Sequence, residues 1–191
     1  DDEYYIGRAR PALHSRIKVG FRKDGRITAL DGFAIVDNGP YDVVSDSRSA
    51  GDHISLSYQP PAMRWRTLTV LTNTPPRGAQ RAPGGMQGNG LMEPIMARAS
   101  RKLGIDQVTI HRINAPEGKA SFGAPNARGT RPVVTSAFLK NALDKGAELF
   151  KWDERKARGV RRNGSKVRGL GVGVSAYSAG SIGFDGLLII K

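Results

Sequence analysis

Polar and apolar residues largely alternate along residues 66–71, a pattern that predicts a half-buried strand. Two further runs rich in β-forming residues, 13–21 and 27–36, are also expected to be strands. Asp24 and Gly25 lie between these two runs, and this pair favours a tight hairpin because both residues tolerate the positive φ that such a turn requires. The first part of the chain is therefore expected to form a β-hairpin and a third strand.

Apolar residues at helical spacing predict helices further along the chain. One helix is expected to follow Gly90, with Pro94 near its start and Gly104 as its end. Its apolar face comprises Leu91, Ile95, Ala99 and Leu103. A short second helix is expected to start at 105–108, and a later helix, capped by Thr135 or Ser136, to run to about residue 152. The apolar stripe of the later helix comprises Phe138, Leu139, Ala142, Leu143 and Leu149.

Strands and helices are mixed without the regular alternation of a doubly wound sheet. This indicates an α+β fold with mixed sheets and packed helices. Residues 41–58 could hold a short helix, 117–132 form a Gly-, Pro- and Asn-rich loop, and 169–177 and 187–190 are expected to be strands. A chain of 191 residues suits one domain or two small ones.

The chain is strongly basic, with 30 Lys and Arg against 17 Asp and Glu and a formal net charge of +13. Residues 151–168 alone hold eight basic and two acidic residues. Such charge can bind nucleic acid, but Trp152 is the only aromatic residue in this stretch and no motif that reads nucleic acid is present. A solvated connection, or a surface that faces an acidic partner, is the favoured interpretation.

The composition also excludes several kinds of site. The chain has no Cys, which excludes disulfides, thiolate metal sites and iron–sulfur ligation within it. No run approaches the ~20 apolar residues of a membrane helix, and no secretory signal pattern is visible, so a cytoplasmic location is expected. Because the chain starts at Asp1 without a Met, we expect a processed product, a trimmed form or a piece of something larger.

Two further patterns, the histidines and a glycine-rich stretch, do not fit the ligand-binding motifs that they resemble. His14, His53 and His111 lack the spacing of a zinc site, so ordinary surface or core roles are expected. The glycines of residues 169–173 resemble a dinucleotide-binding motif only superficially, because no helical pattern follows them.

Residues 77–90 differ from their neighbours and read RGAQRAPGGMQGNG. Glycine lets a bulky polyanionic ligand approach the main chain, and unshielded N–H groups before a helix attract anions. Arg77 and Arg81 add positive charge. From the residues alone, the segment is either a cradle for an anion or cofactor or a long surface turn.

The order of motifs around this segment resembles a known family. Residues 72–88 read TNTPPRGAQRAPGGMQG, and Met92-Glu93, LGID at 103–106 and a final Asn114 follow. This series resembles the molybdenum-cofactor-binding subunit of the xanthine oxidase family, although His111 takes the place of that family's Arg. Upstream, KVGF at 18–21 agrees, and downstream RGLG at 168–171 is similar to the family's RG-x-G segment.

The resemblance implies a cofactor and a reaction. Molybdenum–molybdopterin, expected in its cytosine dinucleotide form, would lie against Gly78, Ala79, Gln80 and Arg81, with no protein ligand to the metal. The implied reaction is a hydroxylation with oxygen derived from water, and its electrons would leave through iron–sulfur clusters to FAD on partner subunits. No catalytic residue is expected in this chain, because the family's catalytic Glu lies near the end of the subunit.

The resemblance also implies two substrate-binding positions. Arg10 would orient the substrate or stabilise developing charge, the alternative being an ordinary surface cation. Pro83 stands where purine-oxidising members carry an aromatic residue, and Gln80 and Ala82 also depart from the family pattern. The missing aromatic ring argues against a purine substrate.

Gly-rich segments that flank this region in the family are absent, so the chain is expected to be a middle portion of the subunit and inactive alone. Residues 1–132 would belong to a first cofactor-binding domain and 133–191 would start a second. Expected partners are the remaining parts of the molybdenum subunit, an iron–sulfur subunit and an FAD subunit, without nucleic acid or a membrane span. The alternatives are a molybdenum-dependent hydratase on the same scaffold and a basic nucleic-acid-binding or assembly module.

Overall fold

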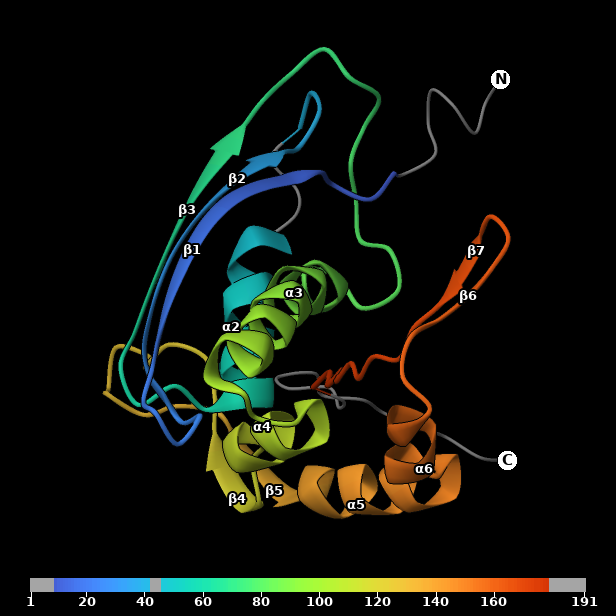
Figure 1. The fold of residues 1–191 in the computed structure, drawn as a ribbon. Helices are drawn as coiled ribbons and strands as arrows, with labels where there is room; N and C mark the ends of the chain where they lie inside the picture. Colours follow the sequence, from blue (N-terminus) through green and yellow to red (C-terminus); the bar gives the residue numbers. More distant parts are fainter. Residues whose placement is uncertain (1–8, 42–45, 179–191) are drawn as a thin grey trace, which may run out of the picture.

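A computed structural model describes residues 9–41 and 46–178, which fold into three small sheets and packed helices (Figure 1). The predicted α+β class is confirmed. The strands are β1 (Leu13–Phe21), β2 (Ile27–Asp37), β3 (Met63–Val70), β4 (Gly118–Ser121), β5 (Val133–Ala137), β6 (Arg161–Asn163) and β7 (Lys166–Arg168). The helices are α2 (Asp46–Tyr58), α3 (Gly85–Leu103), α4 (Gln107–Asn114), α5 (Leu139–Phe150) and α6 (Trp152–Ala157).

The largest sheet has the order β1–β2–β3. β1 and β2 form the predicted antiparallel hairpin, and β3 adds to β2 in parallel after the crossover through α2. In the hairpin turn the Gly25 N–H donates to the carbonyl of Arg22 at 3.0 Å. Gly25 has φ 87° whereas Asp24 keeps a negative φ, so glycine alone supplies the conformation that we expected of both residues.

One face of this sheet packs on the helices and the other is open. Trp65 of β3 pairs with Gly32 of β2, and its ring lies against Gly51 of α2, where only the missing side chains of the two glycines leave room for an indole. Leu68 and Val70 lie on the opposite face and are 51% and 37% exposed. The predicted third strand is confirmed, but Leu68 and Val70, the apolar residues of its alternating pattern within β3, point away from the core.

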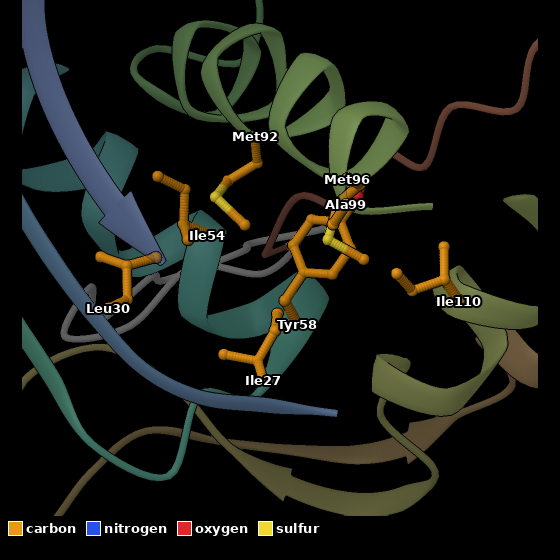
Figure 2. Close-up of a cluster of buried hydrophobic side chains, with 8 residues drawn as sticks. All are labelled: Ile27, Leu30, Ile54, Tyr58, Met92, Met96, Ala99 and Ile110. Atoms are coloured by element: carbon orange, nitrogen blue, oxygen red, sulfur yellow. The ribbon is translucent and has the colours of Figure 1, made fainter. Parts of the chain in front are cut away.

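The core lies between the sheet and the packed pair α2 and α3 (Figure 2). Each large apolar side chain removed from water there contributes roughly 1.5–3 kcal/mol. The buried cluster comprises Ile27 and Leu30 of β2, Ile54 and Tyr58 of α2, Met92, Met96 and Ala99 of α3, and Ile110 of α4.

Helix α3 begins at Gly85, one and a half turns earlier than its apolar face predicts. Pro94 therefore lies in the interior of the helix and not in its first turn, which corrects the prediction. The predicted end is confirmed: Gly104 adopts the left-handed conformation with φ 68° and ψ 22°. Asp106 then caps α4 by accepting the Val108 N–H at 2.9 Å.

The segment after α4 differs most from its prediction. Thr135 and Ser136 do not cap a helix, because they lie in β5, which pairs antiparallel with β4 inside the stretch that we expected to be a loop. Helix α5 starts at Leu139 and has no buried residue. At its two ends, Phe138 is 68% and Leu149 73% exposed, so the predicted apolar stripe is largely uncovered.

The C-terminal part continues through α6 and the small β6–β7 hairpin. Residues 169–177 form no strand, which corrects that prediction, and the strand expected at 187–190 lies outside the described residues. None of the helices in the described ranges has the length and apolarity that a membrane crossing requires.

Candidate functional site

The candidate site is the segment that joins β3 to α3, residues 71–84. Ala79, Gln80 and Arg81 lie exposed at its centre. Within residues 9–41 and 46–178, the main-chain N–H groups of Ala79 and Arg81 donate no hydrogen bond. The segment therefore presents free main-chain donors next to a guanidinium group, which is a donor set that suits an anion.

Asp37, at the end of β2, holds the start of this segment. Its carboxylate accepts hydrogen bonds from the Thr72 hydroxyl at 2.5 Å, the Thr74 hydroxyl at 3.2 Å and the Arg77 guanidinium at 3.1 Å. The Gly39 N–H adds a fourth bond at 3.0 Å. These bonds, the one from Thr72 first, lower the pKa of Asp37 to about 2. Asp37 is therefore ionised at neutral pH and ties residues 72–77 to the sheet.

Main-chain hydrogen bonds fix the next residues against the N-terminal part of the chain. The Gly78 N–H donates to the carbonyl of Ala9 at 3.0 Å, and the Ala9 N–H donates to the carbonyl of Pro76 at 3.2 Å. Gly78 is buried. Its amide thus holds the loop in place, and the exposed amides begin one residue later.

Arg10 is joined to the same loop. Its guanidinium donates to the carbonyl of Arg81 at 2.8 Å and to the side-chain oxygen of Gln87 at 3.3 Å. Gln87 in turn donates to Asp46 at 2.9 Å. Arg10 is half-buried and held by the loop. The structure therefore brings Arg10 and Arg81 together across 71 positions of sequence.

The glycines at the start of α3 allow close packing of α3 on α2. Gly84 has φ 73°, and a Cβ there would collide with the carbonyl oxygen of Asp46. A Cβ at Gly88 would lie 2.6 Å from the carbonyl oxygen of Ala50. We expected the glycines of this segment to admit a ligand to the main chain; at these two positions they admit helix α2 instead.

A histidine on α2 connects the loop to residues 175–178. The Nδ1 of His53 lies 2.7 Å from the carbonyl of Ser49, so it donates, and Nε2 accepts the Ser178 N–H at 3.3 Å. The ring of Tyr177 stacks on the imidazole at a centroid distance of 4.3 Å. The Ser49 hydroxyl donates to the carbonyl of Pro83 at 2.7 Å. This contact places Pro83, predicted as a substrate position, at the junction of the loop and α2.

His111 serves a different purpose, inside the core. Its Nδ1 donates to the carbonyl of Gln107 at 2.6 Å, and its Nε2 lies within hydrogen-bond distance of a Glu93 carboxylate oxygen, at 2.9 Å. The Tyr58 hydroxyl donates to the other oxygen of Glu93, and burial together with that carboxylate raises the pKa of Tyr58. His14, by contrast, lies exposed on β1. The predicted core or surface roles of these histidines are confirmed.

The residues around the loop fit a polyanionic cofactor. Arg10 and Arg81 supply positive charge, and free amides supply directed donors. Two buried polar atoms beside the loop, Arg77 Nε and Asp46 Oδ1, have no hydrogen-bond partner within the described residues. The described part of the chain contains no group of three or more His, Cys, Asp or Glu side chains that could hold a metal ion.

Fold and loop together define a class: an α+β domain in which a cationic, glycine-rich segment offers main-chain donors to a cofactor. The family model of the molybdopterin cofactor-binding domain matches residues 1–115. The chain belongs to this family, in the group of molybdenum hydroxylases that contains xanthine dehydrogenase and aldehyde oxidoreductase.

Two relatives and one solved structure show the extent of the similarity. The xanthine dehydrogenase molybdenum-binding subunit of Escherichia coli O157:H7 is 30% identical over 177 residues, which cover 90% of this chain and 22% of that protein. The aldehyde oxidoreductase of Megalodesulfovibrio gigas is 27% identical over 185 residues, 96% of this chain and 20% of that one. The solved aldehyde oxidoreductase from Desulfovibrio gigas matches with a TM-score of 0.64 at 26% identity, over 78% of this chain and 16% of that chain. The chain thus spans about a fifth of the length of these relatives.

Several residues of the site had no assigned role in our reading of the sequence. Asp37, Ser49 and His53 lie outside the glycine-rich segment, and their sequence neighbours give no signal of a site. Thr72, Thr74 and Gln87 lie within residues 72–88, the stretch that resembles the family. Polar side chains next to a loop often hydrogen-bond to its main chain, so they could have been predicted to hold the loop in place.

Proposed function

We propose that this chain forms part of the cofactor-binding region of the catalytic molybdenum subunit of a xanthine oxidase- or aldehyde oxidoreductase-like hydroxylase. The observation that carries the proposal is the exposed loop around Ala79 and Arg81, whose main-chain N–H groups donate no hydrogen bond within the described residues and stand beside two arginines. Family membership and the similarity to an aldehyde oxidoreductase support it.

The proposed role of this chain is to bind and orient. When bound, a molybdenum–molybdopterin cofactor supplies the redox chemistry that hydroxylates a substrate with oxygen derived from water. The main-chain N–H groups of Ala79 and Arg81 would donate to it, and Gly78 holds the loop in position through its hydrogen bond to Ala9. The hydrogen bonds of Asp37 keep the loop rigid, so that these donors need no reorganisation during the reaction.

Arg10 and Pro83 are proposed to face the substrate. Arg10 uses two of its five N–H donors on Arg81 and Gln87, which leaves the others for an anionic or carbonyl oxygen. Pro83 offers no aromatic face on which a flat ring could stack, so a substrate other than a purine is expected.

The wider assembly is also part of the proposal. Iron–sulfur clusters and FAD on partner subunits would accept the electrons, and the other parts of the molybdenum subunit would complete the active site. The cofactor would take the cytosine dinucleotide form, and the enzyme would work in the cytoplasm. Residues 1–132 and 133–191 would belong to two successive cofactor-binding domains.

The test uses the full-length subunit in its natural complex. Arg81→Ala should lower turnover about tenfold or more, the equivalent of about 1.4 kcal/mol in the barrier. Arg22→Ala, on the distant β1–β2 turn, is the control and should leave turnover unchanged. Turnover is measured with an aldehyde and an artificial electron acceptor, alongside molybdenum and pterin content. Wild-type turnover and full cofactor content in Arg81→Ala would contradict the assignment, and water addition without reduction of the acceptor would identify a hydratase.

A further inference from the structure

The β6–β7 hairpin projects from the body of the molecule and is exposed along its whole length (Figure 1). Its two-residue turn starts with Gly164 at φ 58°, as tight hairpins require. A two-stranded hairpin is only marginally stable in water unless something packs against it. Here Arg161 stands directly opposite Arg168, which adds like-charge repulsion between the strands. The isolated hairpin therefore lacks a stabilising contact.

The hairpin and the helix before it carry positive charge that is not neutralised. Of the eight basic side chains in residues 151–168, only Lys156 has an ion-pair partner in the described part of the chain, Asp106 at 2.6 Å. Arg155 instead lies over the ring of Phe150, 4.4 Å from its centroid. The remaining basic groups point into solvent without a carboxylate.

Apolar groups are interleaved with this charge. Val160 and Val167 are 75% and 61% exposed, and Leu149 at the end of α5 is 73% exposed. Exposed apolar residues next to arginines are typical of protein interfaces, which are enriched in Arg and apolar at their centre.

We propose that the basic hairpin surface, residues 149–168, docks on an acidic surface of a separate partner subunit. Charge complementarity identifies the partner's chemistry: carboxylates that pair with Arg158, Arg161, Arg162 and Arg168 around a small apolar centre. A second copy of this chain would set like charges against each other. Burial inside the chain's own subunit would desolvate a row of guanidinium groups, which is more costly than pairing them at a hydrated interface.

Nucleic acid is a poorer occupant of this surface. Trp152 is buried, and its indole N–H is committed to Asp106 at 3.0 Å. The ring of Phe150 is covered by Arg155. Phe150, 42% exposed and with Arg155 over its ring, is thus the one exposed aromatic side chain in residues 149–168, whereas binding to single strands normally uses several stacking faces along a groove.

The first test is carbodiimide cross-linking of the purified natural complex, which joins lysines to carboxylates in direct contact. Lys151 and Lys166 should link to Asp or Glu residues of a different polypeptide. Links only within the same polypeptide, or none, would overturn the proposal.

The second test is charge reversal in the full-length subunit. Arg161→Glu with Arg162→Glu should weaken binding to the purified partner subunits about tenfold or more and flatten the dependence of binding on salt. The matched control, Arg22→Glu with Lys23→Glu on the β1–β2 turn, should change binding less than twofold. The proposal would be refuted if this variant bound the partner subunits as tightly as the wild type does. It would also be refuted if the variant assembled normally but lost an RNA binding that the wild type shows at physiological salt. Molybdenum content of the free subunit is measured in parallel. Because residues 149–168 lie outside the Ala79–Arg81 loop, wild-type molybdenum content with unchanged partner binding would count against docking alone, and failure of docking is distinguishable from failure of the proposed function.

Discussion

At the scale of single residues, the buried pair His111 and Glu93 shows how a charged side chain is kept inside a small core. The His111 side chain has no exposed surface and Glu93 is 20% exposed, yet each polar atom of the imidazole has a partner. Tyr58 satisfies the remaining carboxylate oxygen. Burial of such groups is tolerable only while every one of these contacts is made.

His111→Leu should therefore destabilise the fold by about 2–3 kcal/mol, because it leaves Glu93 with Tyr58 as its remaining partner. Urea unfolding of the full-length subunit measures the loss. His14→Leu, on the exposed side of β1, is the matched control and should change stability by less than about 0.5 kcal/mol. Equal effects of the two variants would contradict a structural role for the buried pair.

Asp37 gives a prediction about pH. Its pKa of about 2 lies below the ordinary value of 3.8, so its bonds stabilise the folded state above pH 3.8 and this contribution is lost as the pH falls toward 2. The contribution at neutral pH is at most about 2 kcal/mol. Asp37→Asn should lower stability at pH 7 and make it less dependent on pH between 4 and 2.

Unfolding midpoints of the full-length subunit at a series of pH values check this prediction. Asp153→Asn serves as the control, because this exposed carboxylate forms no ion pair within the described residues. A pH profile of Asp37→Asn that matches the wild type would show that the Asp37 carboxylate is not the anchor.

At the scale of elements, the start of α3 is set by its contact with α2. Gly84 is the residue before the helix, and its left-handed φ and missing Cβ let α3 begin directly against the main chain of Asp46. Gly90, six residues further along, faces open space. The two glycines thus differ in what a side chain would meet, although the sequence makes them look alike.

Gly84→Ala should destabilise the subunit by about 2 kcal/mol or more, since strain at positive φ adds to the collision with Asp46. Gly90→Ala should stabilise it by roughly 0.5–1 kcal/mol, because alanine favours the helix. Thermal unfolding of both variants, with cofactor content, makes the comparison. If Gly84→Ala kept its stability and lost only cofactor, ligand approach and not helix packing would explain the glycine.

At the scale of the whole molecule, much apolar surface is uncovered. Leu68, Val70 and Leu71 lie on the open side of β3 and after it, and Phe138 precedes α5. Apolar patches of this kind mark surfaces that bury against other protein. A chain that spans about a fifth of its relatives' length leaves room for such covering parts.

The isolated chain is therefore expected to associate or precipitate and to show no turnover. Size-exclusion chromatography and an assay with an artificial acceptor test this, with the full complex as the positive control. A monodisperse, active 191-residue chain would contradict the prediction.

The sequence alone was sufficient where the determining interactions are local. The β1–β2 hairpin, the start of α4 within residues 105–108 and the end of α3 at Gly104 depend on residues a few positions apart, and all three were predicted. The order of motifs in residues 72–114 was also enough to identify the family.

Only the tertiary structure decided what depends on distant contacts. Residues 133–137 form a strand because they pair with β4, although the sequence predicts the start of a helix there. Helix α3 begins at Gly85 because it packs closely on the main chain of α2. Arg10 meets Arg81 because a parallel bridge between residues 9 and 77 draws the N-terminal part onto the loop. Hydrophobic periodicity shows that a helix or strand has one buried face, but it does not show which element covers that face. The hydrophobic effect is non-directional, and the covering element lies elsewhere in the chain.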